Sequence, residues 1–153
     1  MDRHLEERPI TLVGEIFIDL FDENGQIKDR RYIKNLITTA GFNLVSNLLG
    51  QASPRPAAAN YIAIGSGTVG AAVGDTALGF ELPNARLSGT YTLGSNSYTM
   101  VASFPPGTGT GGVTESGMLN ASSTGTLLNR QTFGVVTKGA SDTLQCSWSI
   151  SLS

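Results

Sequence analysis

The clearest pattern in the chain is a strict alternation of apolar and polar residues close to its C-terminus. From Thr143 to Leu152, the apolar positions are Leu144, Cys146, Trp148, Ile150 and Leu152, and Thr, Gln or Ser stands between them. Since successive side chains of a strand point to opposite faces, the pattern predicts a strand with one face in the core. The other face is solvated or touches a neighbour. We therefore interpret Cys146 as a buried, unreactive thiol and Trp148 as a packing residue.

A second alternating segment lies near the N-terminus. Between Ile10 and Leu20, one face carries Ile16, Ile18 and Leu20, and the other carries Glu15, Phe17 and Asp19. Asn24-Gly25 then provides a strong hairpin signal before a polar return strand from Gln26 to Lys34. These residues predict a charged, exposed N-terminal β-hairpin.

The periodicity changes after the hairpin. Apolar residues from Ile37 to Leu48 recur at helical spacing, Thr38 or Thr39 is suited to cap the start, and Gly50 is suited to end the segment. We predict one short amphipathic α-helix. Gly41 inside it costs roughly 1 kcal/mol relative to alanine, which indicates either a close packing contact or a shorter helix.

The rest of the chain consists of short strand-like segments separated by turn residues. Pro54 and Pro56 mark residues 51–60 as a linker between an anchoring unit at 1–50 and a body at 61–153. Strands are expected at 61–64, 89–93, 98–104, 127–137 and 143–152. A chain of many strands and few helices predicts a mainly β fold, with a β-sandwich or jelly-roll body. The Gly/Thr-rich loop at 105–112 should be mobile unless something holds it.

Charge is distributed unevenly along the 153 residues. Residues 1–34 hold eight acidic and six basic side chains, whereas the remaining 119 residues hold only eight charged side chains in all. The net charge of −2 gives no basic excess for nucleic acid or for an acidic membrane surface. The first ten residues are charged and do not read as a secretion signal, and no apolar run is long enough for a membrane helix.

Few residues are available for catalytic chemistry. The chain has one cysteine and one histidine, His4, which stands in the charged N-terminal segment and is expected to be solvated. A GxGxxG sequence at 65–70 follows a strand, but no helical pattern follows it, so we interpret it as a structural loop and not a nucleotide site. The acids Asp75, Glu81, Glu115 and Asp142 are too dispersed for a calcium loop, and ion pairs with Arg86 and Arg130 are favoured. We expect no enzymatic activity, no cofactor and no metal.

Several segments, taken in order, resemble tailed-bacteriophage virion structural proteins. They are Gly14 to Leu20, Lys34 to Gly41, Ile62 to Thr68, Asp75 to Gly79 with Glu81 and Arg86, Thr114 to Asn120, Leu128 to Phe133, and Asp142 to Gln145. The resemblance implies a non-enzymatic particle component with a β-sandwich or jelly-roll fold, assembled in the host cytoplasm and located in the virion. Such folds occur both in capsid decoration proteins and in tail or fibre proteins.

The short chain, without repeats or a coiled coil, favours a capsid decoration (cement) protein that binds the major capsid protein. A tail, baseplate or fibre protein is the alternative, and a carbohydrate-binding β-sandwich is a third hypothesis that the low aromatic content disfavours. The uncharged body and the 105–112 loop also predict self-association, and the virion resemblance implies a trimer. The expected partner contacts are the charged hairpin residues Glu15, Asp19, Arg30, Arg31 and Lys34.

Overall fold

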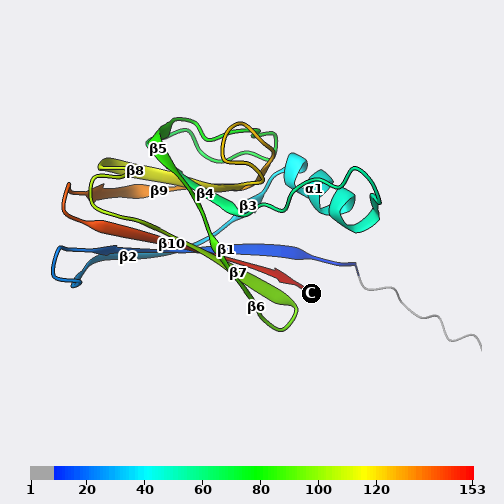
Figure 1. Ribbon diagram of the computed structural model, residues 1–153, viewed down its shortest axis with the longest axis horizontal. Helices are drawn as coiled ribbons and strands as arrows, with labels where there is room; N and C mark the ends of the chain where they lie inside the picture. The colour runs from blue at the N-terminus through cyan, green and yellow to red at the C-terminus, as the bar shows by residue number, and fades with distance from the viewer. Residues whose placement is uncertain (1–8) are drawn as a thin grey trace, which may run out of the picture.

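Two five-stranded antiparallel sheets face each other in the computed structural model, which describes residues 9–153 (Figure 1). Sheet A has the order β2-β1-β10-β7-β6, and sheet B has the order β3-β9-β8-β4-β5. The strands are β1 (Leu12–Phe21), β2 (Ile27–Lys34), β3 (Leu36–Ile37), β4 (Tyr61–Gly65), β5 (Glu81–Ser88), β6 (Thr90–Leu93), β7 (Ser97–Phe104), β8 (Gly111–Leu119), β9 (Leu127–Lys138) and β10 (Thr143–Leu152). The mainly β sandwich fold with a hairpin and one short helix is confirmed.

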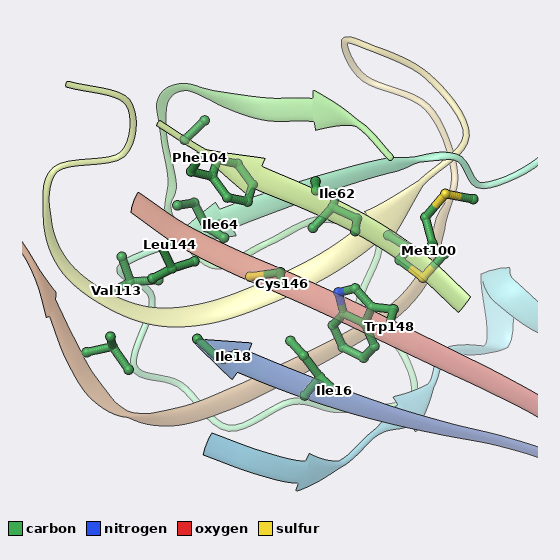
Figure 2. Close-up of a cluster of buried hydrophobic side chains, with 14 of the residues drawn as sticks. Ile16, Ile18, Ile62, Ile64, Met100, Phe104, Val113, Leu144, Cys146 and Trp148 are labelled. Carbon is green, nitrogen blue, oxygen red and sulfur yellow. The ribbon is translucent and has the colours of Figure 1, made fainter. Parts of the chain in front are cut away.

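The core lies between the two sheets, and the alternating segments supply much of it. Figure 2 shows Cys146 and Trp148 of β10 beside Ile16 and Ile18 of β1, with side chains of β4 also in the cluster. Trp148 and Cys146 are fully buried. Burial raises the pKa of the Cys146 thiol to about 12, so this thiol stays protonated at neutral pH. The predicted packing roles of both residues are confirmed.

The N-terminal segment is part of the same core. β1 pairs with β10 along its whole length, from Leu12 opposite Leu152 to Phe21 opposite Thr143, and β2 forms the outer edge beyond it. The inward side chains of β1 belong to the cluster that also contains the body's residues. The expected boundary at 51–60 therefore does not separate two cores, because strand pairing between the chain's ends places β1 inside sheet A.

The hairpin turn and its attachment follow from local chemistry. Asp22 accepts hydrogen bonds from the backbone N–H groups of Asn24 and Gln26, and Gly25 takes a positive φ of 77°. Behind the turn, Lys28 forms a 2.7 Å ion pair with Asp142, at the turn that joins β9 to β10. The hairpin is therefore held in two ways, by the pairing of β1 with β10 and by the ion pair beside its turn.

The one helix in residues 9–153, α1 (Thr39–Gly50), begins where the sequence indicates. The Thr38 hydroxyl accepts a hydrogen bond from the Gly41 N–H at 2.9 Å and donates one to the Leu127 carbonyl at 2.8 Å. A Cβ on Gly41 would overlap the backbone carbonyl oxygen of Leu128 in β9. Of the two interpretations of Gly41, close packing is therefore confirmed. Among residues 9–153, no helix is long and apolar enough to cross a membrane.

The close contact at Gly41 makes its substitution costly. We expect Gly41→Ala to lower the free energy of unfolding by about 1–3 kcal/mol, because a rigid backbone carbonyl occupies the space that the methyl group needs. Gly50→Ala is the matched control, since an added Cβ there meets nothing within 4 Å. Urea unfolding of both variants measures the effect. A Gly41→Ala protein as stable as Gly50→Ala would contradict this packing.

Three strands had no clear signal in the sequence. β3 has two residues, β5 contains Pro83 and Asn84, and β8 combines small and polar residues that are buried on both faces. Alternation of polarity fails in β8 because Glu115 and Ser116 are both fully buried. Their burial depends on partners from distant parts of the chain.

The Gly/Thr-rich loop at 105–112 has a partner within the chain. The buried Lys138 ammonium donates hydrogen bonds to the carbonyls of Pro105, at 3.0 Å, and Asp142, at 2.7 Å. Gly107 donates to the carbonyl of Ala140, and Gly109 packs on Ile64. Ordering this loop therefore requires no second molecule, and the loop no longer supports self-association.

Candidate functional site

The outward face of β1 and β2 gathers most of the predicted contact residues. The strand register places Lys34 opposite Glu15, Tyr32 opposite Phe17, and Arg30 opposite Asp19. We name these six residues the charged stripe. Their side chains share one face because they occupy every second position of each strand, opposite to the face that packs in the core.

Hydrogen bonds hold two of these cross-strand pairs. Arg30 binds Asp19 through both carboxylate oxygens, at 2.7 and 3.3 Å, and this contact raises the pKa of Arg30. The Tyr32 hydroxyl donates to Glu15 at 2.6 Å, which raises the pKa of Tyr32. Both pairs are exposed and contribute little to stability. Their effect is to hold the charges in a fixed arrangement.

An aromatic pair lies at the centre of the charged stripe. The ring centroids of Phe17 and Tyr32 are 5.0 Å apart, the rings are tilted by 40°, and the residues are 42% and 52% exposed. Neither ring is among the contact residues predicted from the sequence. The position of Phe17 between Glu15 and Asp19 on a polar face was a visible signal, whereas its pairing with Tyr32 needed the register.

Arg31 does not belong to this surface. It lies opposite Ile18, on the other face of β2, and its guanidinium pairs with Asp29 at 2.7 and 2.9 Å. The pKa of Asp29 is held below its ordinary value, chiefly by the hydrogen bond from Arg31. Four of the five predicted contact residues are therefore brought together, and the alternation of β2 separates the fifth from them.

The stripe has two exposed cations, Arg30 and, at the end next to β3, Lys34. Glu15, which lies opposite Lys34, accepts a hydrogen bond from Tyr32. Among residues 9–153, no ion pair of the Lys34 ammonium is found. Lys34 therefore presents a positive charge that a partner's acidic group can bind.

Beyond the charged stripe, the outward face of sheet A is uncharged and, apart from Val101, polar. From β10 and β7 this face presents Thr143, Gln145, Ser147, Ser149, Ser151, Ser97, Thr99, Val101 and Ser103. Small hydroxyl side chains leave the sheet surface nearly flat and cost little to desolvate compared with charges. The charges of this face are thus confined to its β1–β2 side, and small neutral groups cover most of the rest.

The GxGxxG loop is occupied by a group of its own chain. The Glu115 carboxylate, fully buried, accepts hydrogen bonds from the backbone N–H groups of Gly67, Gly79 and Phe80 at 2.7–2.9 Å. A Cβ on Gly67 would overlap the Glu115 carboxylate. The absence of a helix after this loop agrees with the interpretation as a structural loop. Gly67 is needed for close approach to the carboxylate, and not for a positive φ.

Arg130 completes this buried cluster. Its guanidinium binds Glu115 at 2.8 Å, Asp75 at 2.7 Å and the Val69 carbonyl at 2.9 Å. Burial raises the pKa of Glu115, but the N–H donors and Arg130 outweigh burial and hold that pKa below its ordinary value. The carboxylate is thus ionised and fully hydrogen-bonded.

The predicted pairing of a body acid with Arg86 is found as well, since Glu81 pairs with it. Asp142 pairs instead with Lys28 of the hairpin, a partner that the sequence did not predict. In the part of the chain that the structure describes, no group of three or more His, Cys, Asp or Glu side chains is arranged to hold a metal ion. His4 lies outside the described residues.

Comparisons with known proteins identify no relative: no family model, no curated protein and no solved structure matches this chain.

Proposed function

We propose that the chain is a non-enzymatic structural component of a bacteriophage particle, and specifically a capsid decoration protein that binds the major capsid protein. The ordered resemblance of its segments to virion structural proteins supports this assignment, as does the β-sandwich fold. The observation that most supports the proposal is the composition of the outward face of sheet A. It joins a fixed set of charges to a broad neutral surface, an arrangement that can align the subunit on a shell.

Each part of that face has a distinct role in the proposal. The paired charges of the stripe set orientation and register, because electrostatic complementarity contributes to specificity more than to affinity. Phe17 and Tyr32 supply apolar area at the centre, and aromatic residues are enriched where interfaces gain most of their energy. The Ser/Thr surface excludes water around them at low desolvation cost.

A tail, baseplate or fibre protein is the alternative assignment, and copy number separates the two. A decoration protein covers the shell, so quantitative mass spectrometry of purified particles should give a copy number comparable to that of the major capsid protein. A far smaller number would support the tail alternative. Absence of the chain from particles would overturn both assignments.

Removing the charge of Lys34 should weaken binding to shells. We expect Lys34→Gln to reduce the affinity for particles stripped of this protein by about twofold to fivefold at low salt, the range of one exposed ion pair. The loss should shrink at high salt, because exposed charges are screened. Co-sedimentation of the protein with stripped particles over a salt series measures it.

Arg55→Gln is the matched control, since Arg55 is an exposed cation that follows α1 and lies outside the charged stripe. It removes the same charge and should leave the affinity unchanged. Equal losses in the two variants would show that net charge matters and the stripe does not.

Self-association is part of the proposal, without a fixed subunit number. The virion resemblance implies a trimer, but the structure now supplies a partner for the 105–112 loop from within the chain. The surface available for contact between copies has to be found elsewhere.

A further inference from the structure

The two edges of sheet A differ sharply in charge. β2 carries five charged residues in eight, whereas β6 (Thr90–Leu93) carries neither a charge nor a proline. Charged side chains on an edge strand discourage pairing with another chain. All four residues of β6 are exposed, and among residues 9–153 no strand pairs with its outer side. The β2 edge is therefore protected against pairing, and the β6 edge is open.

The backbone groups available on β6 can be identified from its register with β7. The Gly94 N–H donates to the Ser97 carbonyl, and Thr92 and Thr90 lie two and four residues before Gly94, opposite Thr99 and Val101. Hydrogen-bonded pairs alternate in an antiparallel ladder, so Thr90 and Thr92 direct their backbone groups to β7. Tyr91 and Leu93 consequently point their N–H and C=O groups outward, as two free donors and two free acceptors.

An apolar groove continues from this edge. It has a volume of about 290 Å³ and lies between α1 and the adjoining end of sheet A, with Leu12, Leu48, Leu49, Tyr91 and Leu152 in its lining. Leu49 is 82% exposed, and Leu93 on the edge itself is 74% exposed. Figure 1 shows β6 and α1 at the same end of the molecule, near the C-terminus. The open edge thus borders the apolar surface of this end.

We propose that the β6 edge pairs with β6 of a second copy of this chain, antiparallel and about a two-fold axis at Thr92. In this register Tyr91 faces Leu93 of the partner copy, and Leu93 faces its Tyr91. All four free groups of each edge then form hydrogen bonds, and sheet A continues through both copies. The aromatic and aliphatic side chains stack across the junction beside the two grooves, a favourable cross-strand pairing.

A second copy is favoured over other occupants because the edge is complementary to itself. A two-fold contact brings the same patch of both copies together, and here donors, acceptors and apolar side chains match under that operation. The segment before Pro9 carries Asp2, Arg3, Glu6, Glu7 and Arg8, which does not match an apolar edge. The proposal does not depend on the particle assignment.

Cysteine cross-linking tests both the contact and its register. Thr92 sits on the proposed axis as a non-hydrogen-bonded pair with Thr92 of the second copy, where Cα atoms lie about 4.5 Å apart, within disulfide range. We expect Thr92→Cys to form a covalent dimer under mild oxidation. The native Cys146 is fully buried and should not react. The unmodified protein should show twice the monomer mass by light scattering at high concentration.

Thr90→Cys is the register control, because Thr90 lies on the same strand and face and is also exposed. In the proposed pairing, Thr90 of one copy lies about 13 Å along the strand from Thr90 of the other, too far for a disulfide. Covalent dimer from Thr92→Cys but not from Thr90→Cys supports the proposal. Equal cross-linking of both variants, an unmodified protein that stays monomeric, or a trimeric mass would overturn it. Capture of this edge by a different protein while the chain stays monomeric would overturn it too.

Discussion

A chain that begins at Ala57 is expected not to fold. The truncation removes β1, β2, β3 and α1, and with them five fully or nearly fully buried apolar side chains: Ile16, Ile18, Leu20, Ile37 and Leu44. At about 2 kcal/mol for each buried side chain, the loss is roughly 10 kcal/mol, comparable to the whole stability of a typical domain. It also exposes the edge of β10, which pairs with β1 over ten positions.

Circular dichroism and limited proteolysis of the truncated chain measure this outcome. The control is a chain that begins at Pro9, which keeps every helix and strand that the structure describes. We expect the control to show a β-sheet spectrum and a cooperative thermal transition, and the Ala57 chain to show neither. A folded, protease-resistant Ala57 chain would restore the division into an anchoring unit and an independent body.

The second large effect is expected at the buried Glu115. Glu115→Gln keeps the shape of the side chain but removes the fully buried carboxylate that pairs with Arg130, which then keeps only the partly exposed Asp75 as its acidic partner. Breaking a buried pair by removing one partner costs about 3–5 kcal/mol. The amide also cannot accept all the hydrogen bonds that Gly67, Gly79 and Phe80 direct at the carboxylate. The loop at 66–80 should detach first.

Urea unfolding measures the global loss, and hydrogen exchange at the Gly67, Gly79 and Phe80 amides measures the local one. Glu81→Gln is the matched control, since the Glu81 carboxylate pairs with Arg86 but is 30% exposed. This control should cost no more than about 1 kcal/mol. If the two variants are equally stable, the cluster around Arg130 does not hold the loop.

The same carboxylate makes stability depend on pH in the acid range. The pKa of Glu115 in the folded protein lies below its ordinary value of 4.5. Its ionised form therefore contributes stability that is fully present above pH 4.5 and is lost as the pH falls toward the folded pKa. The Glu115→Gln protein lacks this contribution, so its stability should fall less steeply with acid than that of the unmodified protein.

Local patterns in the sequence were sufficient for several elements. The alternation at Thr143–Leu152 and around Ile16 and Ile18 predicted strands and the side chains that face the core, because side-chain direction in a strand depends only on position parity. The Asn24-Gly25 turn and the Thr38 cap predicted where the hairpin turns and where α1 begins. Both depend on hydrogen bonds between residues close in sequence.

The same local patterns predicted only part of the contact surface. Parity correctly placed Glu15 and Asp19 on one outward face, but Arg31 was grouped with Arg30 although adjacent residues of a strand point to opposite sides. The stacking of Phe17 on Tyr32 required the hairpin register, in which Asp29 pairs with Leu20 and Ile27 with Phe21, so that Lys28 is an extra residue. The polarity pattern of a single strand contains no information about this shift in the pairing register.

By itself, the sequence determined the mainly β class, the hairpin, the helix and most inward-facing side chains, because these depend on interactions over a few residues. Only the tertiary structure decided that β1 and α1 share one core with the body, that Glu115 is buried beside Arg130, and that β6 is an open edge. Each of these depends on which distant segments pair: β1 with β10, β8 with β4 and β9, and β7 with both β10 and β6. Which strands pair depends on the burial and hydrogen bonding of the whole chain. Two segments with the same local pattern can therefore occupy different positions in the sheets.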